Sequence, residues 1–391
     1  MSENCIKREP NVSKKKIFVS LLFVPGFYLM VLFTTGLIVF VGSGLIFIIH
    51  YFVGKFLGEL GFAYFGLILL DALPFFGMIF GVVSCFIAII SMFFKNKQFE
   101  PAILINPHDH PKLRDLISEL SVKMDSQMPD AIILHVKSKF FVSEGKINVF
   151  NGTAKGRILA ISYPLLHVLT VNELRAIIAH ELSHFTGRDL VFHRFVFPVY
   201  KGANKYLEYI TSLFNHNGRR RPIFISIPMI LPKVLMEYYL KIFHKYNMKI
   251  SREMEYRADY IASKMCGKEN FKEALSKLIS HGNVFNRLID EQMTEKIVHG
   301  FQFENYFSFY REHVETYKKQ IEESLGKALR DHEVEYATHP TLKNRIVNLP
   351  NVDSIYDNNE EALDLINSFD YIEVSMTKYY NYYLNDNAIH F

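Results

Sequence analysis

Three residues of one short segment carry the chemistry that stands out in this sequence. His180 and His184 are four positions apart, and Glu181 directly follows the first of them. On an α-helix the two imidazoles point the same way, at a separation that a single metal ion can bridge. Glu181 lies about 100° around such a helix and can still reach a water held by the ion. The segment predicts metal-assisted hydrolysis with Glu181 as the base, and two exposed histidines on an amphipathic helix are the alternative.

A catalytic zinc site needs one more ligand, because such sites use three protein ligands and keep the fourth position for water. The segment 251–259 is acidic and compatible with a helix. Glu255 and Asp259 share one face of that helix, so the spacing allows either as the ligand, with the other orienting a histidine. A surface helix with salt bridges to Arg252 and Arg257 is the competing interpretation.

The elements around these residues have their own sequence signals. Thr170 and Glu173 have the spacing of a capping box, and an apolar stripe follows, so a helix is expected to carry the two histidines and to end near Gly187. Asn151-Gly152 predicts the turn of a β-hairpin. The other expected elements are strands at 102–105, 131–136, 146–150 and 157–162, and helices at 112–123, 301–330 and 360–369. This pattern predicts a mainly α protein with a small β-sheet, an α+β fold.

In order and spacing, these motifs resemble the HtpX and CAAX prenyl endopeptidase family of integral-membrane zinc metallopeptidases. The residues that carry the resemblance are His180-Glu181-x-x-His184, the segment 251–259, His339-Pro340 and Arg345-Ile346. The resemblance extends from the apolar N-terminal part to about Leu349. It implies a zincin-like metallopeptidase domain with one zinc ion per chain.

The resemblance also implies roles that the spacing left open. Glu255 would be the third zinc ligand beside His180 and His184. Asp259 would contact the ligands without binding the ion itself. His339 would approach the active site as a hydrogen-bond donor to the substrate or the oxyanion, with Arg345 close by.

Asn148 and Phe150 resemble the residues that flank the active site in this family. They lie in the expected strand 146–150, which we interpret as a sheet edge. An extended substrate could add a strand there, because such pairing supplies backbone hydrogen bonds without demanding a particular sequence.

The composition is that of a mixed membrane and globular protein. The 391 residues are 49% hydrophobic and 21% charged, with a mean hydropathy of +0.08. Cys5, Cys85 and Cys266 lie far apart, which excludes a disulfide framework and a thiolate zinc site. The net charge is +4, and the basic residues cluster beside apolar stretches. Because these clusters are not interleaved with aromatic residues, no nucleic-acid partner is expected.

The apolar stretch 17–94 is too long for one globular core and is expected to meet the lipid bilayer. Since a span needs about 20 apolar residues, the stretch divides into crossings at 28–50 and 62–94, joined by a polar link at 54–61. A cleaved signal peptide is the alternative, but the first apolar run continues well past any plausible cleavage site.

Lysines at both outer ends of this hairpin outnumber the single Lys55 in the link. The positive-inside rule then predicts a multi-pass protein of the cell membrane whose catalytic domain faces the cytoplasm. A second apolar region, 190–244, is interrupted by charges. Its part 222–243 is expected to span the membrane, to lie in the interface or to form a buried helix.

Together these observations predict four parts of the chain. They are a cytosolic N-terminal tail at 1–16, a transmembrane hairpin at 17–94, a zinc metallopeptidase domain at 95–350 with the apolar insertion 190–244, and a variable C-terminal tail at 351–391.

The predicted activity is a membrane-bound zinc endopeptidase that cleaves polypeptides, and the resemblance points to misfolded membrane proteins in quality control. A CAAX prenyl-type processing protease is the alternative within the family. A non-catalytic membrane sensor with a structural zinc is the alternative outside it, although such a site would have no use for Glu181. An intramembrane protease is disfavoured because the histidine helix carries charged residues. The oligomeric state is left open.

Overall fold

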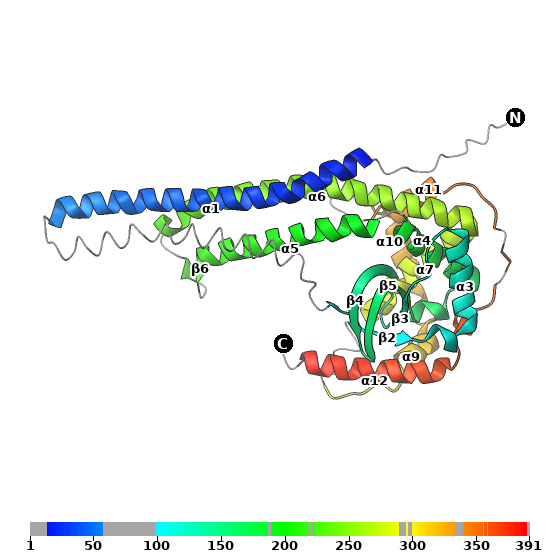
Figure 1. Cartoon of the computed structure of the whole chain (residues 1–391). Coiled ribbons are helices and arrows are strands. Elements are labelled where there is room, and N and C mark those ends of the chain that lie inside the picture. Colours follow the sequence, from blue (N-terminus) through cyan, green and yellow to red (C-terminus); the bar gives the residue numbers. More distant parts are fainter. Residues whose placement is uncertain are drawn as a thin grey trace. The chain divides into compact units, whose positions relative to one another are not determined.

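A computed structural model describes residues 14–57, 98–186, 189–216, 219–220, 223–288, 295, 299–332, 339–354, 356–357 and 359–388. The chain forms two compact units (Figure 1). We call residues 97–190 with 251–391 the sheet unit, and residues 13–96 with 191–250 the helical unit. The second half of the expected hairpin, 62–94, lies outside the described residues.

The helical unit is built from long helices packed side by side. Its described elements are α1 (Lys14–Leu57), most of α5 (Asp189–Phe214), the short strands β6 (Asn215–His216) and β7 (Arg219–Arg220), and the first part of α6 (Ile223–Cys266). The ring of Phe23 in α1 lies against Tyr239 and Phe243 of α6. Thr34 of α1 accepts a hydrogen bond of 2.6 Å from the hydroxyl of Tyr206 in α5. Aromatic and hydroxyl contacts therefore join α1, α5 and α6 within this unit.

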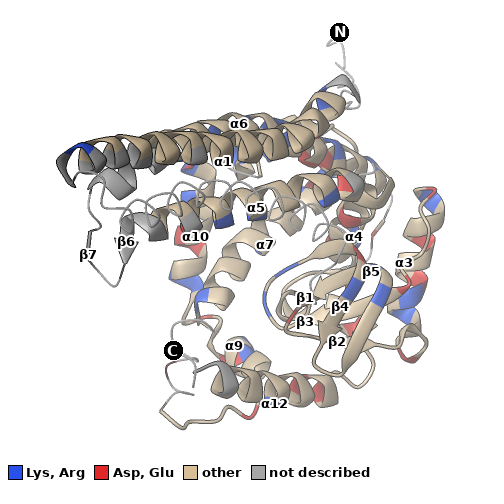
Figure 2. Ribbon diagram, turned by 60° about the vertical axis from the view of Figure 1, so that its left-hand side comes forward, with Lys and Arg blue, Asp and Glu red and all other residues tan. Residues whose placement is uncertain are grey.

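Helix α1 has the length and composition of a membrane span. Its window Lys16–Gly44 has a mean hydropathy of 2.3 with few side chains buried, and Figure 2 shows the helix tan along most of its length. Among the described residues it is the one helix long and apolar enough to cross a bilayer. In the region 222–243, which the sequence left open, residues 223–243 form the first part of α6, and the helix continues to Cys266. Helix α1 runs to Leu57, so the start of the expected link 54–61 is helical.

The sheet unit contains a five-stranded mixed sheet in the order β1-β4-β5-β3-β2. Strands β4 and β5 form the hairpin expected at Asn151-Gly152, and it is longer than the sequence indicated. Side chains alternate between the two faces, as strand geometry requires: Ile132 and Leu159 pack in one core, and Ile133 and Ile158 in another. The strands are β1 (Gln98–Phe99), β2 (Ala102–Ile105), β3 (Ala131–His135), β4 (Phe141–Val149) and β5 (Gly152–Ser162).

Helices of the sheet unit share the larger core with one face of the sheet. They are α3 (Pro111–Lys123), α4 (Val171–Thr186), the last part of α6, α7 (Lys268–Arg287), α9 (Tyr306–His313), α10 (Lys318–Arg330), α11 (Leu342–Asn348) and α12 (Phe369–Ala388), with short 3-10 turns at Pro107–Asp109, Pro164–His167 and Ala362–Leu365. Helix α4 contacts α3, α7 and β4, which fixes the histidine-bearing helix at the centre of the unit. The predicted mostly helical protein with a small sheet is confirmed.

Two helix predictions were wrong in detail. The expected helix 301–330 is divided into α9 and α10. Helix α9 has its own start, where Asn305 accepts hydrogen bonds from the backbone of Phe307 and Ser308, and it buries an aromatic face that α10 does not have. The helix expected at 360–369 is a 3-10 turn, and α12 begins only at Phe369. Ser368 precedes it with φ 54°, a conformation that interrupts a helix.

The C-terminal helix α12 packs into the sheet unit through polar as well as aromatic contacts. Glu373 is fully buried, with its carboxylate 3.0 Å from Nε2 of His167 and 3.3 Å from Nη1 of Arg311. Thr377 accepts a hydrogen bond from the backbone of Tyr306 at 3.1 Å. Residues 359–388 of the region 351–391, expected as a tail, therefore contribute to the core of this unit.

Candidate metal centre

Helix α4 begins with the capping box that the sequence predicted. Thr170 Oγ1 accepts the backbone N–H of Glu173 at 3.3 Å, and the Glu173 carboxylate accepts the backbone N–H of Thr170 at 2.8 Å. Lys277 of α7 adds an ion pair of 2.7 Å to the same carboxylate. These contacts fix the first turn of the helix, so the direction of His180 and His184 two to three turns later is set by backbone geometry.

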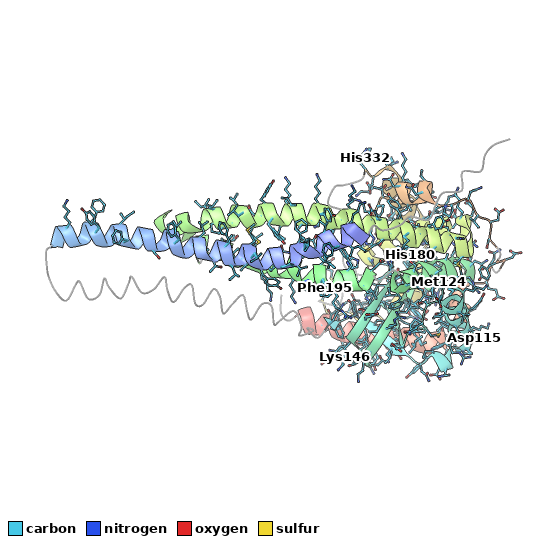
Figure 3. All side chains as sticks on the ribbon, turned by 45° about the horizontal axis from the view of Figure 1, so that its top comes forward. Asp115, Met124, Lys146, His180, Phe195 and His332 are labelled. Atoms are coloured by element: carbon cyan, nitrogen blue, oxygen red, sulfur yellow. The ribbon has the colours of Figure 1, made fainter. Side chains whose placement is uncertain are left out.

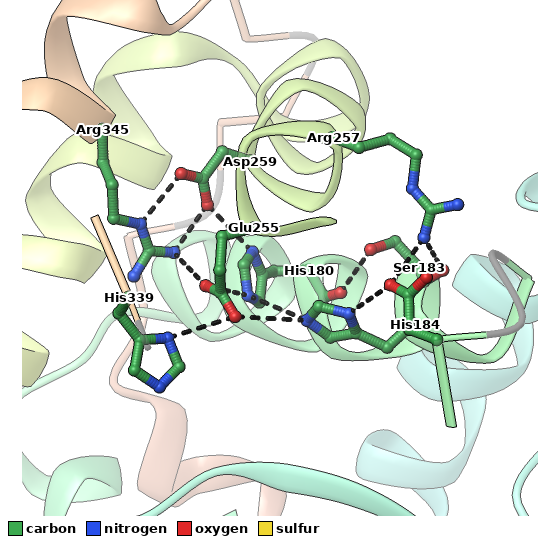
Figure 4. A network of polar contacts seen from close by, with 9 residues as sticks. His180, Ser183, His184, Glu255, Arg257, Asp259, His339 and Arg345 are labelled. Atoms are coloured by element: carbon green, nitrogen blue, oxygen red, sulfur yellow. Dashed lines mark hydrogen bonds and ion pairs between the residues drawn. The ribbon is translucent and has the colours of Figure 1, made fainter. Parts of the chain in front are cut away.

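His180, His184 and Glu255 come together at one point (Figure 4). The two Nε2 atoms are 3.4 Å apart, and the Glu255 carboxylate lies 3.7 Å from Nε2 of His180 and 4.0 Å from Nε2 of His184. One ligand atom from each residue lies within 4.8 Å of the others. His180 and Glu255 are 7% exposed, and Figure 3 shows His180 among densely packed side chains of the sheet unit.

This arrangement fits a divalent metal ion. For tetrahedral zinc with bonds of about 2.0–2.1 Å, two ligand atoms lie about 3.3 Å apart, close to the separation of the two imidazole nitrogens. The buried Oε2 atom of Glu255 has no hydrogen-bond partner, although buried polar atoms are usually satisfied. Two imidazoles and one carboxylate form a donor set suited to zinc.

Asp259 and Arg345 support the site behind His180. Asp259 Oδ1 lies 3.0 Å from Nδ1 of His180, and Arg345 donates two hydrogen bonds of 2.8 and 2.6 Å to the Asp259 carboxylate. Burial by itself would raise the pKa of Asp259, but Arg345 and His180 hold this pKa below its usual value. Arg345 also lies 3.6 Å from Glu255, so one buried cation faces two buried carboxylates.

A corresponding group lies behind His184 and was missed from the sequence. Asp189 Oδ2 is 2.8 Å from Nδ1 of His184 and accepts a hydrogen bond of 2.8 Å from Arg257. Burial opposes protonation of His184, yet Asp189 and neighbouring carboxylates raise its pKa above the ordinary value. Arg257 stands two positions after Glu255, a helical spacing that gives no reason to expect a shared site.

His339 precedes α11 and reaches the carboxylate of Glu255. Its Nδ1 lies 3.1 Å from Glu255 Oε1, while 65% of its side chain is exposed. The hydrogen bond to Glu255 raises the pKa of His339. Burial would raise the pKa of Glu255, but His339, together with the charge of Arg345, holds it well below the ordinary value. Glu181 is partly buried on α4, and its negative charge contributes to the raised pKa values of His184 and His339.

The interpretation of 146–150 as a sheet edge was wrong beyond its first residue. Strand β1 pairs with β4 at Ile147 and Asn148, and the backbone N–H of Phe150 donates to Ala102 at 2.9 Å. The Phe150 ring stacks on Tyr379 of α12 with centroids 5.6 Å apart. The sequence could not show this, because the covering residues come from elsewhere in the chain. Asn148 and Phe150 stay predictions as substrate contacts.

The family model for peptidase family M48 matches residues 107–353, a range that includes every residue of this centre. The chain belongs to peptidase family M48 and is a metalloprotease by that membership. It is 26% identical over 214 residues to Protease HtpX of Haemophilus influenzae (strain ATCC 51907 / DSM 11121 / KW20 / Rd), covering 51% of this chain and 71% of the relative. It is 26% identical over 275 residues to the Protease HtpX homolog of Campylobacter concisus (strain 13826), covering 67% and 82%.

Among solved structures, S. mikatae Ste24p is similar at 15% identity and a TM-score of 0.35. That comparison covers 78% of this chain and 61% of the other chain.

Proposed function

We propose that this chain is a membrane-bound, zinc-dependent endopeptidase. The observation that carries the proposal is the convergence of His180, His184 and Glu255, brought from two helices to within 4.8 Å of one another and supported by buried acids. Such a set of three ligands leaves a fourth position open, as in catalytic zinc sites, whereas structural sites are usually closed by four Cys or His ligands.

When bound, zinc supplies Lewis acidity and lowers the pKa of a coordinated water toward about 7. His180, His184 and Glu255 would hold one ion per chain. Glu181, partly exposed on the same helix, would take the proton of the attacking water and return it to the leaving amine.

His339 would donate a hydrogen bond to the substrate carbonyl. Its Nδ1 contacts Glu255, and a protonated imidazole has donors at both ring nitrogens, so Nε2 would remain for the substrate. Arg345 would hold the Glu255 and Asp259 carboxylates in place and would not contact the substrate.

Polypeptide substrates would bind in an extended form beside β4. In the described part of the chain, β1 pairs with only two residues of β4, and no strand lies on that side of Phe141–Lys146. Backbone pairing there would accept many sequences, which suits the removal of misfolded membrane proteins. The similarity to proteins named Protease HtpX agrees with a proteolytic activity.

In this proposal α1 is the first of at least two membrane crossings, and the sheet unit lies in the cytoplasm. The apolar window of α1 supports the crossing, and the lysines at positions 14–16 support the orientation. Cleavage of the sheet unit by a protease added outside intact cells would contradict this orientation.

The test compares Glu181→Gln with His180→Ala in the full chain purified in detergent. We expect Glu181→Gln to bind zinc as the wild type does but to cleave a denatured membrane protein about 10²- to 10⁴-fold more slowly, because only the base is lost. His180→Ala should lose both zinc and activity, and Glu312→Gln, an exposed residue of α9, should lose neither. Full activity of Glu181→Gln, or activity that survives removal of the metal by a chelator, would refute the proposal.

A further inference from the structure

Each histidine of the candidate metal centre has a carboxylate behind it, and only the one behind His180 was expected. We propose that Asp189 is a positioning residue for His184 and that Arg257 fixes Asp189 in this role. The inference rests on the proposed function, because it concerns how the zinc ligands are held.

The contact geometry assigns Asp189 to the far side of the His184 ring. Its Oδ2 lies 2.8 Å from Nδ1, while Nε2 of the same ring faces Nε2 of His180 at 3.4 Å. An acceptor at Nδ1 keeps the proton of a neutral imidazole on that nitrogen and leaves the lone pair of Nε2 free for a metal. Asp189 is 1% exposed, so water does not compete for the contact.

Arg257 gives the Asp189 carboxylate its counter-charge and ties it to the histidine helix. The same Nη2 atom donates to Asp189 Oδ2 at 2.8 Å and lies 3.3 Å from the backbone oxygen of Ser183. Ser183 is among the last four residues of α4, whose carbonyls lack backbone N–H partners within the helix, and its oxygen also accepts a hydrogen bond of 2.9 Å from the hydroxyl of Thr186. One guanidinium therefore fixes both the orienting acid and the end of the helix that carries His184.

The two histidines are held in parallel ways by different parts of the sheet unit. His180 is backed by Asp259 and Arg345, from α6 and α11. His184 is backed by Asp189, the first residue of α5, and by Arg257 of α6. The Arg257 side chain thus comes from the same helix as the ligand Glu255, two positions away, and acts on the opposite side of the centre (Figure 4).

Glu373 provides a matched comparison for a purely structural role. It is also a buried acid paired with an arginine and a histidine, Arg311 and His167, but neither partner belongs to the metal centre. Neutralising Glu373 should lower the stability of the protein without changing how it holds zinc. Neutralising Asp189 should change zinc binding itself.

The experiment measures zinc affinity of the full chain in detergent, by competition with a chromophoric chelator. We expect Asp189→Asn to weaken zinc binding about 10- to 100-fold, as is usual for partners of metal-bound histidines. Glu373→Gln should bind zinc like the wild type while its metal-free form unfolds at a lower temperature. Arg257→Gln should weaken binding roughly 10-fold or less, and Arg257→Lys, which keeps the positive charge, should restore part of that loss.

Wild-type zinc affinity in Asp189→Asn would overturn the inference, as would equal effects of Asp189→Asn and Glu373→Gln. If Asp189→Asn does not fold, the inference is tested with Arg257→Gln and Arg257→Lys instead. It would be overturned if both variants bound zinc as tightly as the wild type. A wild-type chain that binds no zinc would instead refute the proposed function, so the two failures can be told apart.

Discussion

Arg345→Met tests how much of the stability of the metal-free centre depends on one buried cation. Arg345 is 9% exposed and makes two hydrogen bonds to Asp259, with Glu255 3.6 Å away. Methionine keeps an unbranched apolar chain but removes the charge and all donors. Without a metal ion, the two carboxylates would then remain buried close together without their main counter-charge.

The expected loss of stability follows from the buried carboxylate charge that is left without its cation. Removing one partner of a buried ion pair costs about 3–5 kcal/mol, because the other charge stays buried and unpaired. For a unit of this size, each 1 kcal/mol lowers the unfolding midpoint by about 2–4 °C. We therefore expect Arg345→Met to lower the midpoint of the metal-free protein by about 6–20 °C.

The assay is thermal unfolding in the presence of a chelator, followed for Arg345→Met, Asp259→Asn and the double variant. The loss of unfolding free energy in the double variant should be about 1–3 kcal/mol smaller than the sum of the losses in the two single variants, since the double variant removes both charges of the pair. Lys319→Met is the control, because its ion pair with Glu323 at 3.9 Å lies in solvent and should leave the midpoint unchanged.

Two results would refute this reasoning. One is an Arg345→Met midpoint equal to that of the control. The other is strict additivity of the two single variants, which would mean that Arg345 and Asp259 do not stabilise each other in the folded protein.

Two further predictions concern the stability of the sheet unit. Thr170→Ala should destabilise the protein by about 1 kcal/mol through loss of the helix cap, as measured by chemical unfolding, and an unchanged midpoint would contradict the role of the capping box. Burial would raise the pKa of Glu100, but hydrogen bonds with His135 and Lys139 lower it from 4.5 to about 2. The resulting stability, at most about 3 kcal/mol, is present above pH 4.5 and lost as the pH falls toward 2. Glu100→Gln should therefore flatten the acid side of the stability profile of the metal-free protein, and an unchanged slope would exclude this assignment.

The sequence predicted features whose causes are local. The capping box of α4, the hairpin between β4 and β5 and the i, i+4 direction of two histidines depend on neighbours along the chain, and the structure has each of them. The turn of that hairpin is formed by Phe150 and Asn151, one residue earlier than expected, because Gly152 pairs with Val149. The choice between Glu255 and Asp259 was not local. It depends on which carboxylate meets the imidazole nitrogens from another helix, and the family resemblance, not the spacing, favoured Glu255.

The features that the sequence did not reveal depend on distant partners. Strand β1 covers part of β4, and α12 stacks on Phe150, because residues from both ends of the sheet unit meet there. The pairing of Asp189 with Arg257 joins α5 to α6, and neither residue has a periodicity that points to the other. Such contacts become visible only once the elements are packed.

The order of the metal ligands along the chain has a consequence for biosynthesis. Between His184 and Glu255 the polypeptide runs through α5, β6, β7 and most of α6. A ribosome adds about 5–20 residues per second, so the two histidines leave it seconds before the carboxylate exists. During that interval a nascent chain holds only an incomplete chelate, and its hydrolytic power would arise only after the intervening helices have been synthesised.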